Sequence, residues 1–477
     1  MSQIEPYLDD LSFRRAHLRL MLSAGLGIFL DGYDTAMMAV AIVLISRSWH
    51  LTPASMGLIG ASVLFGAMAG GAIGGRCADL YGRKWLYLID IATFFLAAIL
   101  SAFSWNVTSF FVFRFFVGVG IGIDYPLSAT FLAEFAPRRR RGSMMTWSFG
   151  LFFYIGAVAA LLVGYLLSRF GTDAWRLLFA SGALPAIGLL ILRRTLPESP
   201  RWLLREQRPQ QAIAALRAFQ PDCPLGVEAS SPGPAHSHAL DPARSRWSEL
   251  LCRRYLRRTA LITLPWFLMD IVDYGYSIYI PTLLLAFGMK SFGGAILLSA
   301  GMKCIGTVGF VLVAGSIERV GRIRAQSLGF LGLAAGMTAI ALLAMSEARA
   351  IVPIALCMVF VKICNAFPDI TTWMLPVELF PTDLRASAHG LATSFSRIGA
   401  ATSVFLFPIL QSSWGIGPLL LAIAAAQVLA SLLTLLAAYE PAGRSLEDMA
   451  PPACAPHAAD TGRAAQLLTA RPVPEEP

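Results

Sequence analysis

Twelve apolar stretches run along this sequence, and each is long enough to cross a lipid bilayer as a helix. A spanning helix needs roughly 20 apolar residues. The chain is therefore predicted to be an all-α membrane protein with 12 transmembrane helices in two halves of six. The expected spans lie near residues 19–44, 54–75, 85–103, 109–133, 143–167, 174–193, 259–284, 292–316, 326–345, 350–376, 387–411 and 416–438.

The composition excludes a soluble enzyme and a nucleic-acid-binding protein. Hydrophobic residues make up 56% of the chain and charged residues only 14%, whereas soluble domains carry about 25% charged residues. The net charge of +9 could suggest a nucleic-acid-binding protein. The basic residues instead cluster between the apolar stretches, so we expect a polytopic membrane protein that binds no nucleic acid.

Basic residues mark one side of the predicted membrane protein. Alternate loops on that side contain Arg14, Arg15, Arg19, Arg76, Arg83, Lys84, Arg138 to Arg141, a dozen Arg between positions 193 and 258, Arg319, Arg322, Arg324 and Arg385. The other loops hold only Arg47, Arg169, Lys290 and Arg349. The positive-inside rule then predicts that both termini are cytoplasmic. The expected location is the plasma membrane, which would be the inner membrane in a bacterium.

The two halves repeat each other in the motifs of their loops. Glu134, Pro137 and Arg141 recur at the same spacing as Glu378, Pro381 and Arg385, and Asp79, Gly82 and Arg83 match Glu318, Gly321 and Arg322. Parallel repeats of this kind are typical of transporters that bind substrate between the halves. We divide the chain into an N-terminal half (1–196), a cytoplasmic linker (197–258), a C-terminal half (259–440) and a cytoplasmic disordered tail (441–477).

Several other classes of feature are not expected. The seven Cys are scattered without CxxC or metal-type spacing, so we expect no disulfide, no metal and no cofactor. The first apolar stretch is too long for a signal peptide and is interpreted as a mature span. The run of Gly118, Gly120 and Gly122 lacks the context of a dinucleotide fingerprint and favours close helix packing. No nucleophile and base pair stands out, so the chain is not expected to be an enzyme.

The loop motifs resemble those of the major facilitator superfamily. Residues 75–84 (GRCADLYGRK) are similar to the signature that follows span two of that family. The segments PESPRWL at 197–203 and GRSLE at 443–447 resemble the sugar-porter branch. The resemblance covers nearly the whole chain except the tail and part of the linker, and it implies the twelve-helix fold and secondary transport.

Within that branch, span four carries a more specific resemblance. Residues 114–130 look like span four of the phosphate:proton symporters, and three segments that begin at Asp31, Trp266 and Thr371 agree. The sequence departs from the symporter pattern at four positions, namely Phe152 in place of Gln, Asp369 in place of Asn, Arg397 in place of Lys, and the additional carboxylate Asp273. These positions are expected substrate contacts, so the resemblance implies the transport class and leaves inorganic phosphate open.

Charged residues inside the spans are the candidate functional residues, because a charge at a helix centre costs roughly 2.5–3.5 kcal/mol on insertion scales. Carboxylates suit proton coupling when burial or a neighbouring carboxylate brings their pKa near neutrality. The expected coupling residues are Asp31, Asp34 and Asp124. The expected substrate contacts are Arg114, Asp124, Tyr125, Trp266, Asp270, Tyr274, Asp369 and Arg397, with Lys303 and Lys362 as further cations.

Alternative roles remain for several of these residues. Arg114 could instead form a structural salt bridge, and Asp273 and Asp369 could face a water-filled vestibule. By analogy with the symporters, Asp124 and Asp270 are expected to approach each other across the midplane. In the loops, the expected gating residues are Asp79, Arg83, Glu134, Arg141, Glu378 and Arg385. Asp79 should face a helix N-terminus and pair with an arginine such as Arg141.

The favoured function is secondary active transport of a small polar solute, an anion such as phosphate or a related metabolite, by alternating access with proton symport. One alternative is a carrier or exporter of an organic cation or another metabolite, which six candidate carboxylates against four bases would favour. A second alternative is a membrane receptor that does not transport. The expected partners are the solute, protons and the lipid bilayer, and we expect a monomer.

Overall fold

The computed structural model describes residues 7, 15–49, 51–137, 139–167, 170–171, 173–221, 223, 247–280, 283–284, 287–346, 351–382, 384–437 and 439–444. The long helices of the first half are α2 (Arg15–Trp49), α3 (Pro53–Tyr81), α4 (Arg83–Ala102), α5 (Val107–Phe135), α6 (Arg141–Met145) continued by the π-helix η1 (Thr146–Leu151) and α7 (Phe152–Leu167), and the pair α8 (Ala174–Ser181) and α9 (Ala183–Arg194). Those of the second half are α13 (Leu256–Ile278), α15 (Phe292–Val320), α16 (Arg322–Met345), α17 (Ile351–Leu379), α18 (Arg385–Trp414) and α19 (Ile416–Leu436).

Each predicted span coincides with one long helix or one run of consecutive helices. Ten of these segments are long and apolar enough to cross a membrane by length and composition. The other two, α13 and α18, carry charged side chains of the cavity described below. The described residues therefore confirm the predicted all-α membrane fold with 12 spans.

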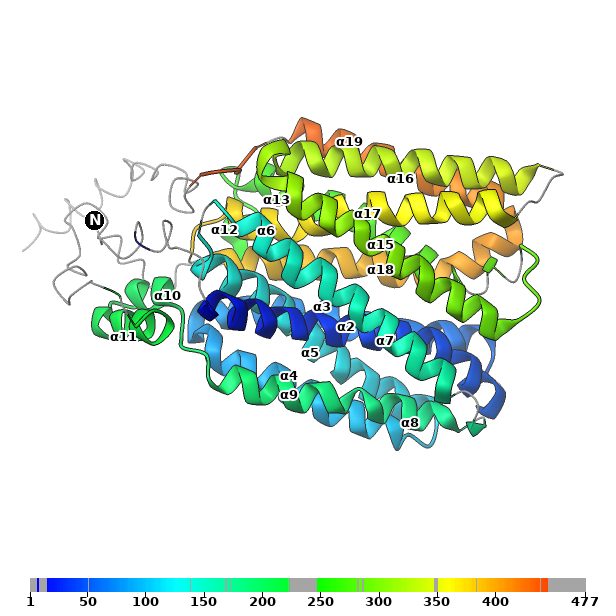
Figure 1. Ribbon diagram of the computed structural model, residues 1–477, viewed down its shortest axis with the longest axis horizontal. Coiled ribbons are helices and arrows are strands. Elements are labelled where there is room, and N and C mark those ends of the chain that lie inside the picture. The colour runs from blue at the N-terminus through cyan, green and yellow to red at the C-terminus, as the bar shows by residue number, and fades with distance from the viewer. Residues whose placement is uncertain are drawn as a thin grey trace, which may run out of the picture.

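The long helices run side by side along the longest axis of the molecule (Figure 1). In that view, the helices of the first half form the lower body and those of the second half the upper body. Helix α3 packs on α5 within the first half and on α18 of the second, and α7 packs on α15 across the two halves. The two halves thus meet along α3, α5 and α7 on one side and α15, α17 and α18 on the other.

Glycine allows α3 and α5 to pack at backbone distance. A Cβ atom added at Gly118 would collide with the backbone carbonyl of Val63, and one at Gly122 would collide with that of Ala67. Small residues at helix contacts allow such close approach in membrane proteins. The structure therefore agrees with the helix-packing interpretation of the glycine run.

The tight turns after α3 and α15 repeat the same construction in each half. Gly82 (φ +93°) and Gly321 (φ +87°) adopt a backbone conformation that L side chains rarely adopt. In each half, the next helix begins directly after this glycine. A glutamate from a distant part of the chain accepts hydrogen bonds from the first backbone N–H groups of that helix. Glu198 does this for α4 at 3.1 Å, and Glu440 does it for α16 at 2.9 and 3.0 Å. A carboxylate at a helix N-terminus is favourable because it satisfies free N–H groups.

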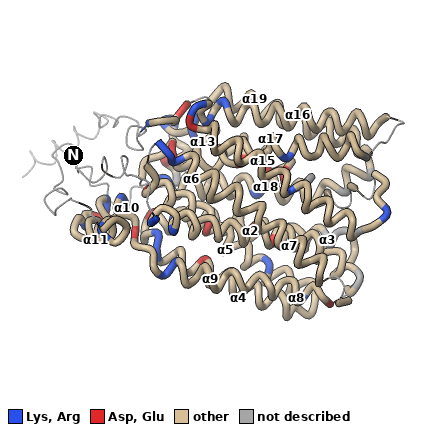
Figure 2. Tube along the Cα trace, in the orientation of Figure 1, with Lys and Arg blue, Asp and Glu red and all other residues tan. Residues whose placement is uncertain are grey.

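Lys and Arg gather at one end of the bundle, hereafter the basic end, where the short helices α10 (Pro200–Arg205) and α11 (Pro209–Phe219) also lie (Figure 2). Helix α12 (Trp247–Leu250) precedes α13. Helix α11 lies within the predicted linker, and its Ile213 and Leu216 are buried. Residues 224–246 of the linker and the predicted tail from residue 445 onward lie outside the described residues.

Candidate substrate cavity and gate

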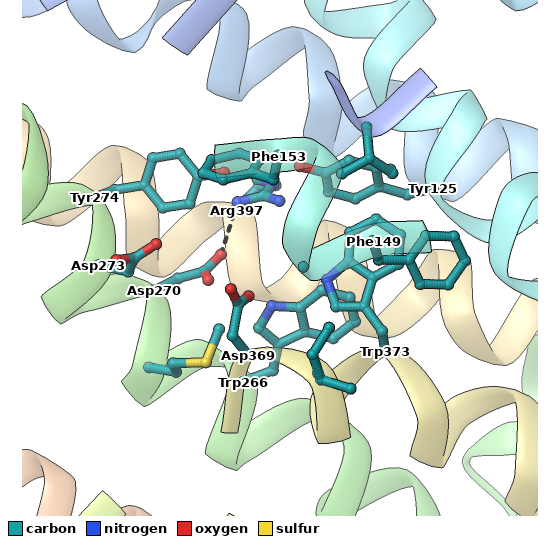
Figure 3. Close-up of a pocket in the computed structure, with 14 residues that line it drawn as sticks. Tyr125, Phe149, Phe153, Trp266, Asp270, Asp273, Tyr274, Asp369, Trp373 and Arg397 are labelled. Carbon is teal, nitrogen blue, oxygen red and sulfur yellow. Dashed lines mark hydrogen bonds and ion pairs between the residues drawn. The ribbon is translucent and has the colours of Figure 1, made fainter. Parts of the chain in front are cut away.

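A cavity lies between the two halves and is lined by side chains from both (Figure 3). The space between the side chains, its opening included, is about 420 Å³. The first half contributes Ile28 of α2, Tyr125 of α5, Phe149 and Gly150 of η1 and Phe153 of α7. The second half contributes Trp266, Met269, Asp270, Asp273 and Tyr274 of α13, Asp369, Ile370 and Trp373 of α17, and Arg397 of α18.

An ion pair between two side chains of the second half lies in the wall of this cavity. The Arg397 guanidinium donates a hydrogen bond to the Asp270 carboxylate at 2.9 Å, and both side chains are almost completely buried. The guanidinium also lies over the rings of Tyr125 and Tyr274, 4.8 and 4.7 Å from their centroids. Contacts with aromatic faces are favourable for a planar cation. Arg397 is thus fixed by one carboxylate and two rings.

Asp31 of α2 joins this centre through Tyr125. The Tyr125 hydroxyl donates a hydrogen bond to the Asp31 carboxylate, and Arg397 and Asp270 lie within electrostatic range of Asp31. Asp31 is 3% exposed and stands behind the tyrosine rather than in the cavity wall. The central group therefore contains two carboxylates and one guanidinium.

A second group of charged side chains comes from α13 and α17 of the second half. Lys362 of α17 donates a hydrogen bond to Asp273 at 3.0 Å and another to the Ser277 hydroxyl, and the Asn365 amide also reaches Asp273 at 3.3 Å. Asp369 lines the cavity without an ion pair or side-chain hydrogen bond among the described residues. The sequence analysis expected Asp369 to contact the substrate, and it considered that Asp273 and Asp369 could instead face a water-filled vestibule. The structure places both side chains in the wall of the cavity.

Aromatic rings form the rest of the wall. The ring centroid of Trp373 lies 4.4 Å from that of Tyr125 and 4.9 Å from that of Phe149. Behind it, His389 of α18 meets Trp266 and Trp373 with centroid distances of 5.4 Å each. Its Nδ1 is 3.2 Å from the Thr393 hydroxyl, and its buried Nε2 has no hydrogen-bond partner within the described part of the chain. Sequence reasoning missed His389 and Trp373, although a histidine inside a predicted span was the available signal.

Arg114 does not reach the cavity. It makes a two-bond ion pair with Asp34, with N to O distances of 2.5 and 2.6 Å, and both side chains are 1% exposed. Its guanidinium also lies over the Phe179 ring, 4.8 Å from the centroid. The structure therefore places Arg114 in the salt bridge of the alternative interpretation, with its guanidinium bound to Asp34, and does not bring it to the cavity.

Asp124 is also placed differently from the expectation. Arg193 of α9 bridges two carboxylates, Asp124 at 2.5 Å and Asp90 of α4 at 2.8 Å, and all three residues are buried. Asp124 is not among the residues that line the cavity, so the expected approach of Asp124 to Asp270 is corrected, and Asp31 takes that place. The cause is Arg193, which sequence reasoning counted among the basic loop residues and which lies 1% exposed inside the first half.

At the basic end, the first repeated motif links the two halves. Arg83 pairs with Glu134 at 3.1 Å and with Asp79 at 3.5 Å, and Glu134 also pairs with Arg385 of α18 at 3.3 Å. The other Asp79 oxygen accepts a hydrogen bond from the Ser387 backbone N–H, in the first turn of α18, at 2.7 Å. Asp79 therefore faces a helix N-terminus, and its ion pair is with Arg83 of its own motif rather than the suggested Arg141.

The second motif repeats this arrangement with the two halves exchanged, so that a residue of the second half contacts a helix of the first. Arg322 pairs with Glu318 at 2.6 Å and with Glu378 through two bonds of 3.0 Å. Glu318 accepts hydrogen bonds from the backbone N–H groups of Gly142 and Ser143 at 2.7 and 3.3 Å, which belong to the first turn of α6 in the first half. Arg141 is 2% exposed at the start of α6. Each half thus holds the N-terminus of a helix of the other half.

The two motifs, the cavity and the fold agree with comparisons to known proteins. A family model described as "Sugar (and other) transporter" matches residues 20–452. The chain belongs to this transporter family. The relative "Inner membrane metabolite transport protein YgcS" of Escherichia coli (strain K12) is 32% identical over 442 residues, which cover 91% of this chain and 94% of the relative.

The family includes proteins with different substrates. A "Probable inorganic phosphate transporter 1-6" of Arabidopsis thaliana is 27% identical over 503 residues, covering 93% of this chain and 95% of the relative. The solved structure of the proton:xylose symporter XylE, of the major facilitator superfamily, bound to 6-bromo-6-deoxy-D-glucose, matches with a TM-score of 0.78 and 25% identity. That match covers 91% of this chain and 98% of XylE.

The predicted superfamily is therefore confirmed, and this member of the sugar transporter family is a secondary transporter and not an enzyme. The receptor alternative is set aside, because the relatives are transporters. The phosphate relative is less identical than the metabolite transporter, so the comparisons do not single out an anion. The chain is a multi-pass membrane protein with relatives in a bacterial inner membrane.

Proposed function

We propose that the chain is a proton symporter of a small polar solute that carries an anionic group, working by alternating access of the two halves. The observation that carries the proposal is the position of the Arg397 and Asp270 ion pair in a cavity formed by both halves. A secondary transporter must bind its substrate where either half can expose it, and the interface of parallel repeats meets that need. XylE, a proton symporter of the same fold, supports the coupling ion.

Proton binding and anion binding are linked through Arg397. Asp31 and Asp270 both act on this one guanidinium, Asp270 directly and Asp31 from behind Tyr125. A proton on either carboxylate removes a negative charge that competes with an anionic substrate for the guanidinium. Because linkage is reciprocal, a bound anion in turn favours the proton. Asp31 is therefore the proposed coupling carboxylate at the substrate.

Two further carboxylates of the first half remain proposed members of the proton route. Asp34 faces Arg114, so protonation would break that pair and free the guanidinium. Asp124 shares Arg193 with Asp90, which leaves two carboxylates for one cation. A proton that arrived at either carboxylate would leave the other one paired with Arg193. Direct contact of substrate with Asp124 is not part of the proposal.

The gating proposal follows from the ion pairs and hydrogen bonds that join the two halves at the basic end. Asp79, Arg83, Glu134 and Arg385 join the halves in one motif, while Glu318, Arg322 and Glu378 do so in the other, with Arg141 at the start of α6. These contacts would hold the basic end closed and break when the cavity opens there. The positive-inside rule makes the basic end cytoplasmic, with both termini and the linker on that side. The boundaries 1–196, 197–258, 259–440 and 441–477 and the monomeric state belong to the same proposal.

An organic cation is the second candidate substrate. Asp31, Asp270 and Asp369 lie in or beside a cavity with tryptophan and tyrosine walls. Carboxylates and aromatic faces are the groups that recognise organic cations. The cation candidate predicts that Asp270→Asn weakens binding of a cation, whereas the anion candidate predicts competition by phosphate and none by sulfate. Phosphate at neutral pH still donates a hydrogen bond to a carboxylate, and sulfate does not.

The test uses purified protein in liposomes with a trapped pH-sensitive dye. Each candidate solute is added outside, with and without an imposed proton gradient, and uptake and internal acidification are recorded together. The proposal expects acidification that depends on the solute and is lost in Asp31→Asn, whereas the exposed Asp173→Asn should behave as the unchanged protein. Solute uptake without proton movement would refute proton symport.

A further inference from the structure

We propose that the solute is a zwitterion, with its cationic group at Asp369 and its anionic group at Arg397, drawn toward Lys303. This inference rests on the proposed function, since it names the substrate class of the same cavity. Its basis is the pair Asp369 and Lys303, two charged side chains of the second half that make no ion pair among the described residues. Two ion pairs, Asp270 with Arg397 and Asp273 with Lys362, account for the others around the cavity.

Asp369 is the proposed binding position for the cationic end of the solute. Its side chain lines the cavity and is partly exposed to it. In Figure 3 the Asp369 carboxylate points into the cavity between Asp270 and the two tryptophans, and no dashed line reaches it. Arg397 is already held at 2.9 Å by Asp270. Lys362 and Arg397 act on Asp369 only from a distance, and a buried carboxylate without a direct ion pair is costly until a cation arrives.

Lys303 of α15 is a second cation for the anionic end of the solute, in addition to Arg397. Its ammonium lies over the rings of Tyr154 and Phe153, 5.3 and 5.9 Å from their centroids, and Phe153 lines the cavity. Lys303 is partly exposed and makes no ion pair within the described residues. The nearby charges that act on it are Lys362, Asp273 and Asp369. Lys303 is not itself among the lining residues, but it lies behind Phe153, which is one of them. Because Asp273 is held by Lys362, Lys303 is the cation there without a direct ion pair.

The aromatic wall fits the cationic end of such a solute. Trp266 and Trp373 lie beside Asp369, with their ring centroids 6.0 Å apart. A cation near a carboxylate and over indole faces gains from both, most when water is excluded. In the view of Figure 3, Asp369 and Phe153 lie on opposite sides of Arg397. Asp369 and Lys303 act on each other electrostatically but make no ion pair with each other among the described residues. The solute therefore carries its charges at two ends and not on adjacent atoms.

Singly charged and neutral solutes fit this pair of subsites less well. A neutral sugar would leave both Asp369 and Lys303 without a direct ion-pair partner. A compact dianion drawn toward Lys303 would also meet Asp369, which lines the cavity and lies within electrostatic range of Lys303, and like charges repel. A zwitterion compensates both charges at once and adds no net charge, which suits transfer across a low-dielectric barrier.

The experiment measures binding to the purified full-length protein in detergent, with no gradient, by tryptophan fluorescence and thermal shift. The zwitterions are glycine betaine, γ-aminobutyrate and trigonelline, and the comparison solutes are choline, benzoate, D-xylose and inorganic phosphate. At least one zwitterion is expected to bind about tenfold more tightly than choline and benzoate, because each charged contact contributes separately. The longer zwitterions should exceed glycine betaine.

Two variants separate the subsites. Asp369→Asn should weaken the zwitterion about tenfold and leave benzoate unchanged, and Lys303→Met should weaken it about tenfold and leave choline unchanged. The exposed Asp173→Asn and Lys290→Met are matched controls and should change neither. Tighter binding of phosphate or xylose than of every zwitterion, no zwitterion binding, or a Lys303→Met variant that equals Lys290→Met would overturn the proposal. Since no gradient is involved, failure of proton symport leaves this result standing, and the reverse also holds.

Discussion

The two halves share one fold but place their buried charges differently. In the first half, Arg114 and Arg193 are enclosed by the carboxylates Asp34, Asp90 and Asp124, away from the cavity wall. In the second half, Arg397, Asp270, Asp273 and Asp369 all line the cavity. Because the motifs at the basic end are kept in both halves, the difference is confined to the membrane interior. Under the proposed function, this difference would assign proton handling to the first half and solute recognition mainly to the second.

The enclosed cluster of the first half should be the most sensitive to loss of one charge. Arg193→Met leaves Asp90 and Asp124 buried without their cation, and removing one partner from a buried ion pair costs about 3–5 kcal/mol. Thermal unfolding in detergent should therefore show a larger loss of stability for Arg193→Met than for any single substitution in the cavity wall. The triple variant Arg193→Met, Asp90→Asn, Asp124→Asn should recover most of that loss. Unchanged stability of Arg193→Met alone would show that the carboxylates already carry protons.

Asp31 stands where the two halves meet, so its loss should separate coupling from binding. Asp31→Asn is expected to abolish accumulation driven by a proton gradient while membrane insertion stays intact, because the titratable group is lost and a desolvation cost is relieved. Uptake into liposomes and expression in the membrane fraction measure the two effects. Asp173→Asn serves as the control. Concentrative uptake at the unchanged rate would remove Asp31 from the coupling role.

The gate motifs offer a finer comparison of the halves. Asp79 is completely buried, whereas the Glu318 side chain is 26% exposed, although both hold a helix N-terminus of the other half. Asp79→Ala should therefore weaken closure of the basic end by about 1–3 kcal/mol, and Glu318→Ala should weaken it less. The rate at which a cysteine at the buried position Ala388→Cys is labelled, in a background without other cysteines, reports the opening. Equal labelling in both variants would contradict the ranking.

Sequence reasoning succeeded where structure is local or repeated. The spans follow from apolar length. The repeated motifs at the basic end were found from their recurrence at equal spacing, and their gating role stays a prediction. It failed where a residue's role depends on which helix lies opposite. Asp124 was expected at the substrate, but the partner that decides its position, Arg193, lies 69 positions away on α9. The same limit applied to Arg114, whose two alternatives could be separated only once Asp34 was seen against it.

The smallest expected effect concerns His389, a positioning residue of the second half that was missed for the same reason. It meets Trp266 and Trp373 edge to face and reaches the cavity only through them. His389→Phe keeps a ring at this place but changes its polarity, so the wall should shift and solute affinity should fall a few-fold, in line with roughly 0.5–1.5 kcal/mol for an aromatic pair. Thr393→Val removes only the hydrogen bond to Nδ1 and is the matched control. Because no first-half charge contacts His389 in the described residues, the ratio of protons to solute should stay constant. A changed ratio would mean that the second half also handles the proton and that the division of roles between the halves is wrong.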